Sequence, residues 1–208
     1  MSLYHYSRAV EDFRSARRKA ALKDILTKLT GQTDDLLPFE EVRKRLHAVQ
    51  ASKSILDDVP LAHIVGSVGR YQDFTRDFLP RASVDEDRWA RVKTAVSDGS
   101  QIPPVDLYRI GEGYFVLDGN HRISIARQVG ATHIQAYVTE FHTPIPLTPD
   151  LDLDDLIIKA EYADFLELTH LDVSRPDADL SVTSPGRYRK LAEHIDVHRY
   201  SMGIDQKQ

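Results

Sequence analysis

The sequence contains no cysteine. This absence excludes disulfides, thiolate nucleophiles, cysteine-ligated zinc and iron–sulfur clusters. The sequence also has no apolar run of about 18 residues, the length that predicts a membrane-spanning helix. Its first residues, Met1 to Arg8, lack the basic-then-apolar order of a secretory signal peptide. We therefore expect a cytoplasmic protein with no membrane partner.

Glycine and proline are not abundant either, at 10 residues each in a chain of 208. With 41% hydrophobic and 28% charged residues, the composition is that of a globular protein rather than a disordered tail or a fibre. At roughly 100–200 residues per domain, the length allows one elaborated domain or two small ones.

Acidic residues outnumber basic ones, 32 to 27, so the formal net charge is −5. This balance excludes a protein whose whole surface binds nucleic acid. The charge is unevenly distributed, because residues 1–50 hold 10 Lys and Arg against 7 Asp and Glu, whereas residues 148–208 hold 7 against 13. The N-terminal end is basic and the C-terminal end is acidic.

The N-terminal residues have the pattern of a helical arm, which we place at residues 1–57. Apolar residues recur at a spacing near 3.6 from Leu3 to Leu29, which predicts a helix ending near Gly31, and Pro38 predicts a second short helix. The first helix carries a basic stripe made of Arg14, Arg17, Arg18, Lys19 and Lys23. The stripe is suited to DNA phosphates, or it is a solvated face that pairs with the acidic C-terminal end.

The remaining residues predict a mixed α/β (α+β) fold with a small mixed sheet at residues 58–142. The predicted elements are a strand at 61–65, a helix at 84–98 opened by a capping box of Ser83 and Glu86, a hairpin at 105–117, a helix ending at Gly130 and a strand at 133–138. Three prolines at 143–149 mark a boundary. We interpret residues 143–208 as a linker and a C-terminal extension with helices at 153–168 and 188–195.

The residues between the hairpin and the next helix are suited to binding an anion. Gly119 lets a phosphate approach the backbone, where the N–H groups of the first helical turn point outward. His121 and Arg122 add side-chain donors, and Asp118 could hold Mg²⁺ or accept a proton from an attacking hydroxyl. The structural alternative is a turn in which Asp118 caps the helix and pairs with Arg122.

A second candidate loop follows the first predicted strand. Gly66 permits a close backbone approach to a ligand, and the N–H groups from Ser67 onward, with Arg70, could hold a second phosphate or an acidic substrate. The alternative is a plain turn with a solvated Arg70.

The order of these elements and the Gly-x-His-Arg core at Gly119 to Arg122 resemble the superfamily of ParB N-terminal domains and sulfiredoxins, also described as the ParB-like nuclease domain, over about residues 58–140. This resemblance implies that Gly119, Asn120, His121 and Arg122 bind nucleotide phosphates. The free serine kinases of the superfamily carry Asp-Gly-His-His-Arg, which is more similar to Asp118 through Arg122 and implies a catalytic Asp118.

Three departures separate this chain from branches of that superfamily. Sulfiredoxins carry their catalytic cysteine where Asn120 stands, so sulfinic-acid repair is excluded. Partition ParB proteins carry Gly-Glu-Arg-Arg in place of Gly119 to Arg122, which leaves CTP selectivity open. The glutamate that the kinases use after their first strand has no counterpart in residues 64–70.

We therefore expect a nucleotide-binding protein that hydrolyses a nucleotide or transfers phosphate to a small hydroxyl compound. Its cofactors would be a nucleoside tri- or diphosphate and Mg²⁺, with Asp118 as base or metal ligand and His121 as a second catalytic residue. The alternative is a ParB-like transcriptional or partition regulator that binds DNA through the basic N-terminal helix, and a third option is an interaction scaffold. A homodimer is compatible with each.

Overall fold

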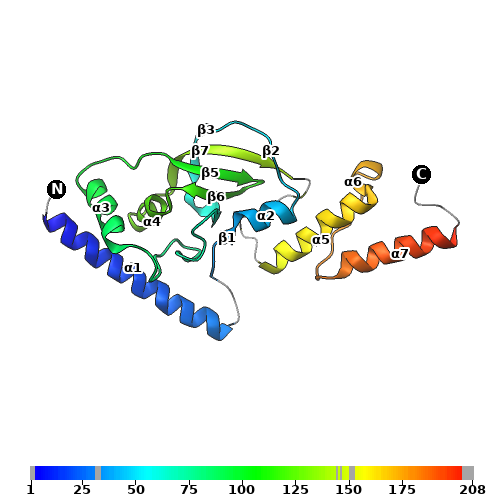
Figure 1. Ribbon diagram of the computed structural model, residues 1–208, viewed down its shortest axis with the longest axis horizontal. Helices are drawn as coiled ribbons and strands as arrows, with labels where there is room; N and C mark the ends of the chain where they lie inside the picture. Colours follow the sequence, from blue (N-terminus) through cyan, green and yellow to red (C-terminus); the bar gives the residue numbers. More distant parts are fainter. Residues whose placement is uncertain (1–2, 31–33, 144, 146, 150–152, 203–208) are drawn as a thin grey trace.

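The structure is a computed structural model and describes residues 3–30, 34–143, 145, 147–149 and 153–202. Helices cover both faces of one mixed sheet of seven strands, so the protein has the expected mixed α/β fold (Figure 1). The strands are β1 (Leu37–Pro38), β2 (Val49–Gln50), β3 (Ile55–Pro60), β4 (Ile64–Ser67), β5 (Val105–Ile110), β6 (Gly113–Asp118) and β7 (His133–His142). The helices are α1 (Leu3–Thr30), α2 (Phe39–Arg45), α3 (Glu86–Ser97), α4 (Asn120–Gln128), α5 (Leu153–Thr169), α6 (Leu171–Ser174) and α7 (Arg187–Ser201).

The sheet combines parallel and antiparallel pairs in the order β1-β4-β6-β5-β7-β2, with β3 also paired to β7. Strands β5 and β6 form the expected antiparallel hairpin, while β4 with β6 and β5 with β7 are parallel. Because β4 and β6 run in the same direction, with Ser67 opposite Val116, the segments that follow them leave from the same edge of the sheet. That edge is where the candidate loops begin.

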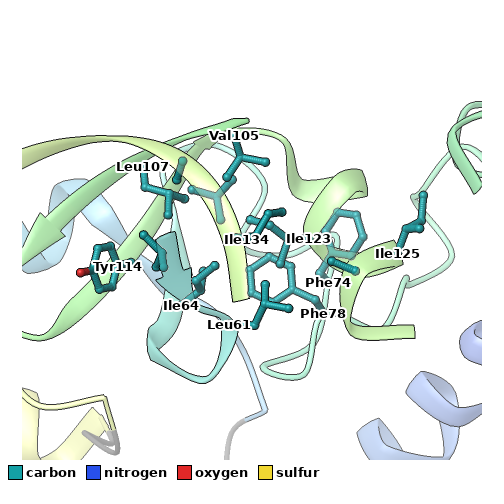
Figure 2. Packing of buried hydrophobic residues seen from close by; sticks show 14 of the residues in the cluster. Leu61, Ile64, Phe74, Phe78, Val105, Leu107, Tyr114, Ile123, Ile125 and Ile134 are labelled. Atoms are coloured by element: carbon teal, nitrogen blue, oxygen red, sulfur yellow. The ribbon is translucent and has the colours of Figure 1, made fainter. Parts of the chain in front are cut away.

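The sheet separates two hydrophobic clusters. One cluster joins the sheet to α1, α3 and α4, and Figure 2 shows its centre, where Ile123 of α4 lies among Phe74, Phe78 and sheet residues such as Val105. The other cluster joins the opposite face to α2, α5 and α7, with Phe39 in edge contact with Phe115 at 5.5 Å between ring centroids. Both helical ends of the chain therefore contribute to a core.

Helix α1 confirms the predicted N-terminal helix and packs along α3. The Phe13 ring lies 5.6 Å from the ring of Trp89, and both residues are fully buried. The Trp89 indole N–H donates to the Ser124 hydroxyl of α4 at 3.1 Å, which ties three helices together. Arg14 of α1 also donates two hydrogen bonds to Glu86 of α3. The division of the chain at residue 57 stays a prediction.

Two local predictions around this core are wrong. Residues Leu61–His63 form a 3-10 helix, and the strand begins only at Ile64, because the chain turns after leaving the edge strand β3. The helix predicted at 84–98 is capped by Asp85, whose carboxylate accepts from the Arg88 N–H at 2.9 Å. Ser83 instead donates to Asp73 at 2.7 Å, so it is not part of a capping box.

The C-terminal helices form where the sequence predicts them, as α5 and α7. Tyr162 and Tyr188 stack between the two helices, with ring centroids 4.9 Å apart. In the proline-rich segment before α5, Leu147 is buried and its carbonyl accepts from the Glu112 N–H at 2.9 Å, so this part of the chain packs on the hairpin. Among the described residues, no helix combines the length and apolarity needed to cross a membrane.

Candidate functional site

Helix α4 begins with a glycine in a conformation that other residues rarely adopt. Gly119 has φ +109° and is the N-cap of the helix. A β-carbon at this position would lie 2.5 Å from a methyl group of Val105. The first hydrogen bond of the helix runs from the Ile123 N–H to the Gly119 carbonyl, so the preceding amides are at the open amino end of the helix. Gly119 thus allows α4 to begin at Asn120, directly after β6 ends at Asp118.

Asp118 and Arg122 are paired across this turn. The Asp118 carboxylate accepts from the Arg122 guanidinium at 2.5 Å, and the same guanidinium donates to the carbonyl groups of Pro103 and Pro104. The pairing in the structural alternative is therefore present, although Gly119 and not Asp118 occupies the N-cap position. Most of the Arg122 side chain is covered, whereas 65% of the Asp118 side chain is exposed.

A cleft of about 430 Å³ lies between α3 and the start of α4. Its lining includes four arginines, one from the loop after β4, two from α3 and one from α4, namely Arg70, Arg88, Arg91 and Arg122. Asp118 is the one carboxylate in the described lining. Four arginines and the amino end of a helix therefore line one cavity whose described lining holds a single carboxylate, which makes the cavity attractive to anions.

Arg88 and Arg91 were not predicted from the sequence. They are three residues apart on α3 and therefore share a face of that helix. Both are exposed, and in the described part of the chain the Arg88 guanidinium has no ion-pair partner, while the Arg91 Nε donates to the Asp87 carbonyl at 3.3 Å. Only the packing of α3 beside α4 distinguishes them from ordinary surface arginines.

His121 and Asn120 lie at the base of the cleft and are nearly inaccessible to solvent, with 7% and 6% of their surface exposed. Both ring nitrogens of His121, and the side-chain oxygen of Asn120, are buried with no hydrogen-bond partner. The imidazole instead packs edge-on against Phe74 at 5.7 Å. Burial, with the nearby charges of Arg88 and Arg70, lowers the His121 pKa to about 4, so the ring is neutral at pH 7.

The structure separates the residues that the sequence predicts for the second candidate loop. Arg70 lines the cleft, where it also pairs with Asp73 at 3.3 Å. Gly66 lies within β4, where a β-carbon would be 2.3 Å from the Leu37 carbonyl oxygen, and Ser67 donates from its fully buried hydroxyl to the Val116 carbonyl. Neither belongs to the cleft lining, so packing accounts for both residues, and ligand binding by them stays a prediction.

The cleft offers limited ligands for a divalent cation. Mg²⁺ is commonly held by one or two carboxylates together with substrate phosphates and water. Asp118 could supply the one carboxylate that this arrangement requires. Its Oδ2 atom accepts the hydrogen bond from Arg122, and its Oδ1 atom has no hydrogen-bond partner among the described residues. Within the described residues no cluster of three or more histidine and acidic side chains is arranged to hold a metal. An ion here would depend on the phosphates of its ligand.

No family model matches the sequence, and no curated protein matches it significantly. Among solved structures, the chain is similar to sulfiredoxin from Arabidopsis thaliana, with 18% sequence identity and a TM-score of 0.32. The similarity covers 42% of this chain and 88% of that one.

Proposed function

We propose that this protein binds a nucleoside tri- or diphosphate by its phosphate groups in the cleft between α3 and α4. The observation that carries the proposal is the convergence of four arginines and the open end of α4 on a cavity with one carboxylate. Consecutive phosphates carry several negative charges, and guanidinium groups on both walls can each meet a different phosphate. The cavity volume lies in the usual range for small-molecule sites.

The arginines of α3 are the decisive residues for a test. Because Arg88 has no ion-pair partner in the described chain and Arg91 makes one weak backbone contact, their removal leaves the core intact. Arg122 is less suitable alone, since Arg122→Ala also removes the contacts to the carbonyls of Pro103 and Pro104.

Calorimetric titration of ATP, ADP, CTP and GTP with Mg²⁺ tests the proposal directly. We expect at least one nucleotide to bind, and Arg88→Ala and Arg91→Ala each to weaken it about 10- to 100-fold, which corresponds to a charged hydrogen bond of about 1.5–3 kcal/mol. Arg187→Ala, at an exposed arginine of α7, is the matched control and should leave affinity unchanged. No heat with any nucleotide, or equal binding by the α3 variants, would contradict the proposal.

Phosphate transfer is the further step that we propose for this site. The oxygen of a water or of a small hydroxyl compound would form a bond to the terminal phosphorus and give its proton to Asp118. The bond from that phosphorus to the bridging oxygen would break, and the nucleotide, shortened by one phosphate, would leave while the arginines and the α4 amides hold the phosphoryl oxygens. In the alternative role, Asp118 would hold Mg²⁺ together with the phosphates, and the ion would neutralise charge on the nucleotide. Both ring nitrogens of His121 are buried, so the structure supports only a role for His121 in shaping the base of the cavity.

DNA binding through α1 has weaker support. Of the basic stripe on this helix, Arg14 pairs with Glu86, and Lys23 pairs with Asp34 and Asp77. These ion pairs use two of the five cations of the stripe within the molecule, which reduces the positive charge available to a phosphate backbone.

A further inference from the structure

The second half of α1 exposes aliphatic side chains to solvent. Leu22, Ile25 and Leu26 have 63%, 56% and 60% of their surface exposed. Arg18 shares their helix face at spacings of four and seven residues from Leu22 and Ile25, and Lys19 lies three and seven residues from Leu22 and Leu26. Neither cation has an ion-pair partner in the described part of the chain. We call these five residues the α1 patch.

A groove of about 410 Å³ lies between α5 and α7, toward the other end of the molecule. Its apolar lining comes from both helices and consists of Phe165, Leu168, Tyr188 and Ala192. Leu168 is 62% exposed although it borders a hydrophobic cluster. Asp164 lines the groove, and Glu167 lies one position before Leu168 on the exposed side of α5. The groove therefore combines an apolar floor with an acidic rim.

The α1 patch and this groove are complementary in polarity and in charge. One is an aliphatic helix face beside two cations, and the other is an apolar groove beside two carboxylates. The chain does not join them, because α1 runs along α3 on one side of the sheet while α5 and α7 lie on the far side (Figure 1). The acidic C-terminal helices therefore have no access to this part of α1 in the same molecule.

We propose that the protein forms a reciprocal dimer in which the α1 patch of each copy occupies the α5–α7 groove of the other. An amphipathic helix that places its apolar side chains in a groove is a common mode of recognition. Arg18 and Lys19 of one copy then lie against Asp164 and Glu167 of its partner. Because each chain carries both surfaces, one two-fold axis satisfies both contacts and closes the assembly.

The charges that surround the groove favour a cationic occupant. His47, after α2, contacts Asp164 at 3.0 Å and Glu167 at 3.2 Å, so one imidazole faces two carboxylates. Glu161 accepts from the Gly186 N–H, so it is committed within the chain. Arg189 is the one cation in the described lining, and it lies 3.8 Å from Glu193 on its own helix.

Sedimentation equilibrium of the full chain at micromolar concentration provides the first test. We expect a dimer whose dissociation constant rises with NaCl concentration, since the pairs at its rim are screened by salt. The double variant Arg18→Glu/Lys19→Glu should raise the dissociation constant at least tenfold. Arg8→Glu, which reverses an exposed charge near the start of the same helix, should leave it unchanged.

A charge swap between the two surfaces locates the interface. A variant with Asp164→Lys/Glu167→Lys should also fail to dimerise alone, while its mixture with the α1 double variant should form a heterodimer, because both contacts then pair opposite charges. A single chain that carries all four changes should dimerise as well. Restoration in either case also shows that the variants are folded.

Several results would overturn the proposal. A monomer at every concentration excludes the dimer, and a dimer that is indifferent to both reversals places the interface elsewhere. Open polymers that grow with concentration contradict the reciprocal two-fold arrangement. A monomer that shifts random duplex DNA through Arg18 and Lys19, with a steep dependence on salt, would assign the α1 patch to nucleic acid instead.

Discussion

The carboxylate of Asp118 lies 2.5 Å from the guanidinium of Arg122, one helical turn further along the chain. This pair places the proposed base and the proposed phosphate ligand in direct contact before any ligand is bound. An incoming phosphate competes with Asp118 for Arg122, so the pair opposes binding while it holds the arginine in position.

Asp118→Asn separates the two roles of this carboxylate. The substitution removes a negative charge from the cleft and frees the Arg122 guanidinium, so we expect nucleotide affinity to be kept or to increase, by up to about tenfold. If Asp118 is the base, phosphate release or transfer should fall at least about 100-fold. Calorimetry and a phosphate-release assay measure the two effects.

The matched control for that variant is Asp106→Asn. Asp106 lies opposite Asp118 in the β5–β6 register, but it does not line the cleft. It should change neither affinity nor turnover. Loss of binding by Asp118→Asn with an intact fold would instead make this residue a ligand-holding group.

Gly119→Ala should destabilise the protein by about 2–4 kcal/mol. The substitution adds the cost of a left-handed backbone to the clash of a β-carbon with Val105. Gly130→Ala is the control, because Gly130 also has a positive φ, +77°, but has nothing within 4 Å of its β-carbon position. Urea denaturation should show a loss of about 1–2 kcal/mol for the control. Equal losses for both variants would mean that Val105 moves aside.

The turn at Gly119 was predictable because its signals are local. Within residues 113–130 the sequence has an apolar strand, then a glycine, then apolar residues at helical spacing. The structure has β6, the left-handed N-cap Gly119 and α4 in the same order. The mixed fold follows from the same kind of pattern. The long N-terminal helix was likewise visible in the apolar spacing of residues 3–29.

The cleft itself was only half predictable. Arg88 and Arg91 have the sequence pattern of a solvated helix face, and only the packing of Trp89 against Ser124 brings them beside α4. Gly66 was assigned to a ligand loop, but the feature that requires glycine there is Leu37, whose strand pairs with β4 from a distant part of the chain. Contacts between remote segments leave no signal in a local pattern.

Phe13→Ala tests whether α1 belongs to the folded core. Phe13 is fully buried against Trp89, so its loss should cost about 3–5 kcal/mol of unfolding free energy and weaken the positioning of α3. Tyr4→Ala, at a residue of the same helix that is 68% exposed, should cost less than about 0.5 kcal/mol. Similar small losses for both variants, measured by urea denaturation, would mean that α1 detaches without unfolding the rest.

The buried imidazole of His121 should make stability depend on pH. Its folded pKa, about 4, lies below the ordinary value of 6.5, because burial and then the charges of Arg88 and Arg70 disfavour the protonated ring. Between these values the unfolded chain binds a proton that the folded protein does not, so stability falls as the pH drops from about 6.5 toward 4. The full shift corresponds to about 3 kcal/mol.

The contribution of His121 is the difference between two pH profiles of unfolding free energy, one for the natural chain and one for His121→Gln. The variant lacks the titrating ring, so its profile should be flatter between pH 6.5 and 4 by up to about 3 kcal/mol. His194→Gln, at an exposed histidine of α7, controls for general effects of losing an imidazole and should keep the natural slope. Parallel profiles for all three proteins would mean that the His121 ring reaches solvent and titrates normally. In that case the ring could also donate a proton within the cleft, and this result would support a catalytic role for His121.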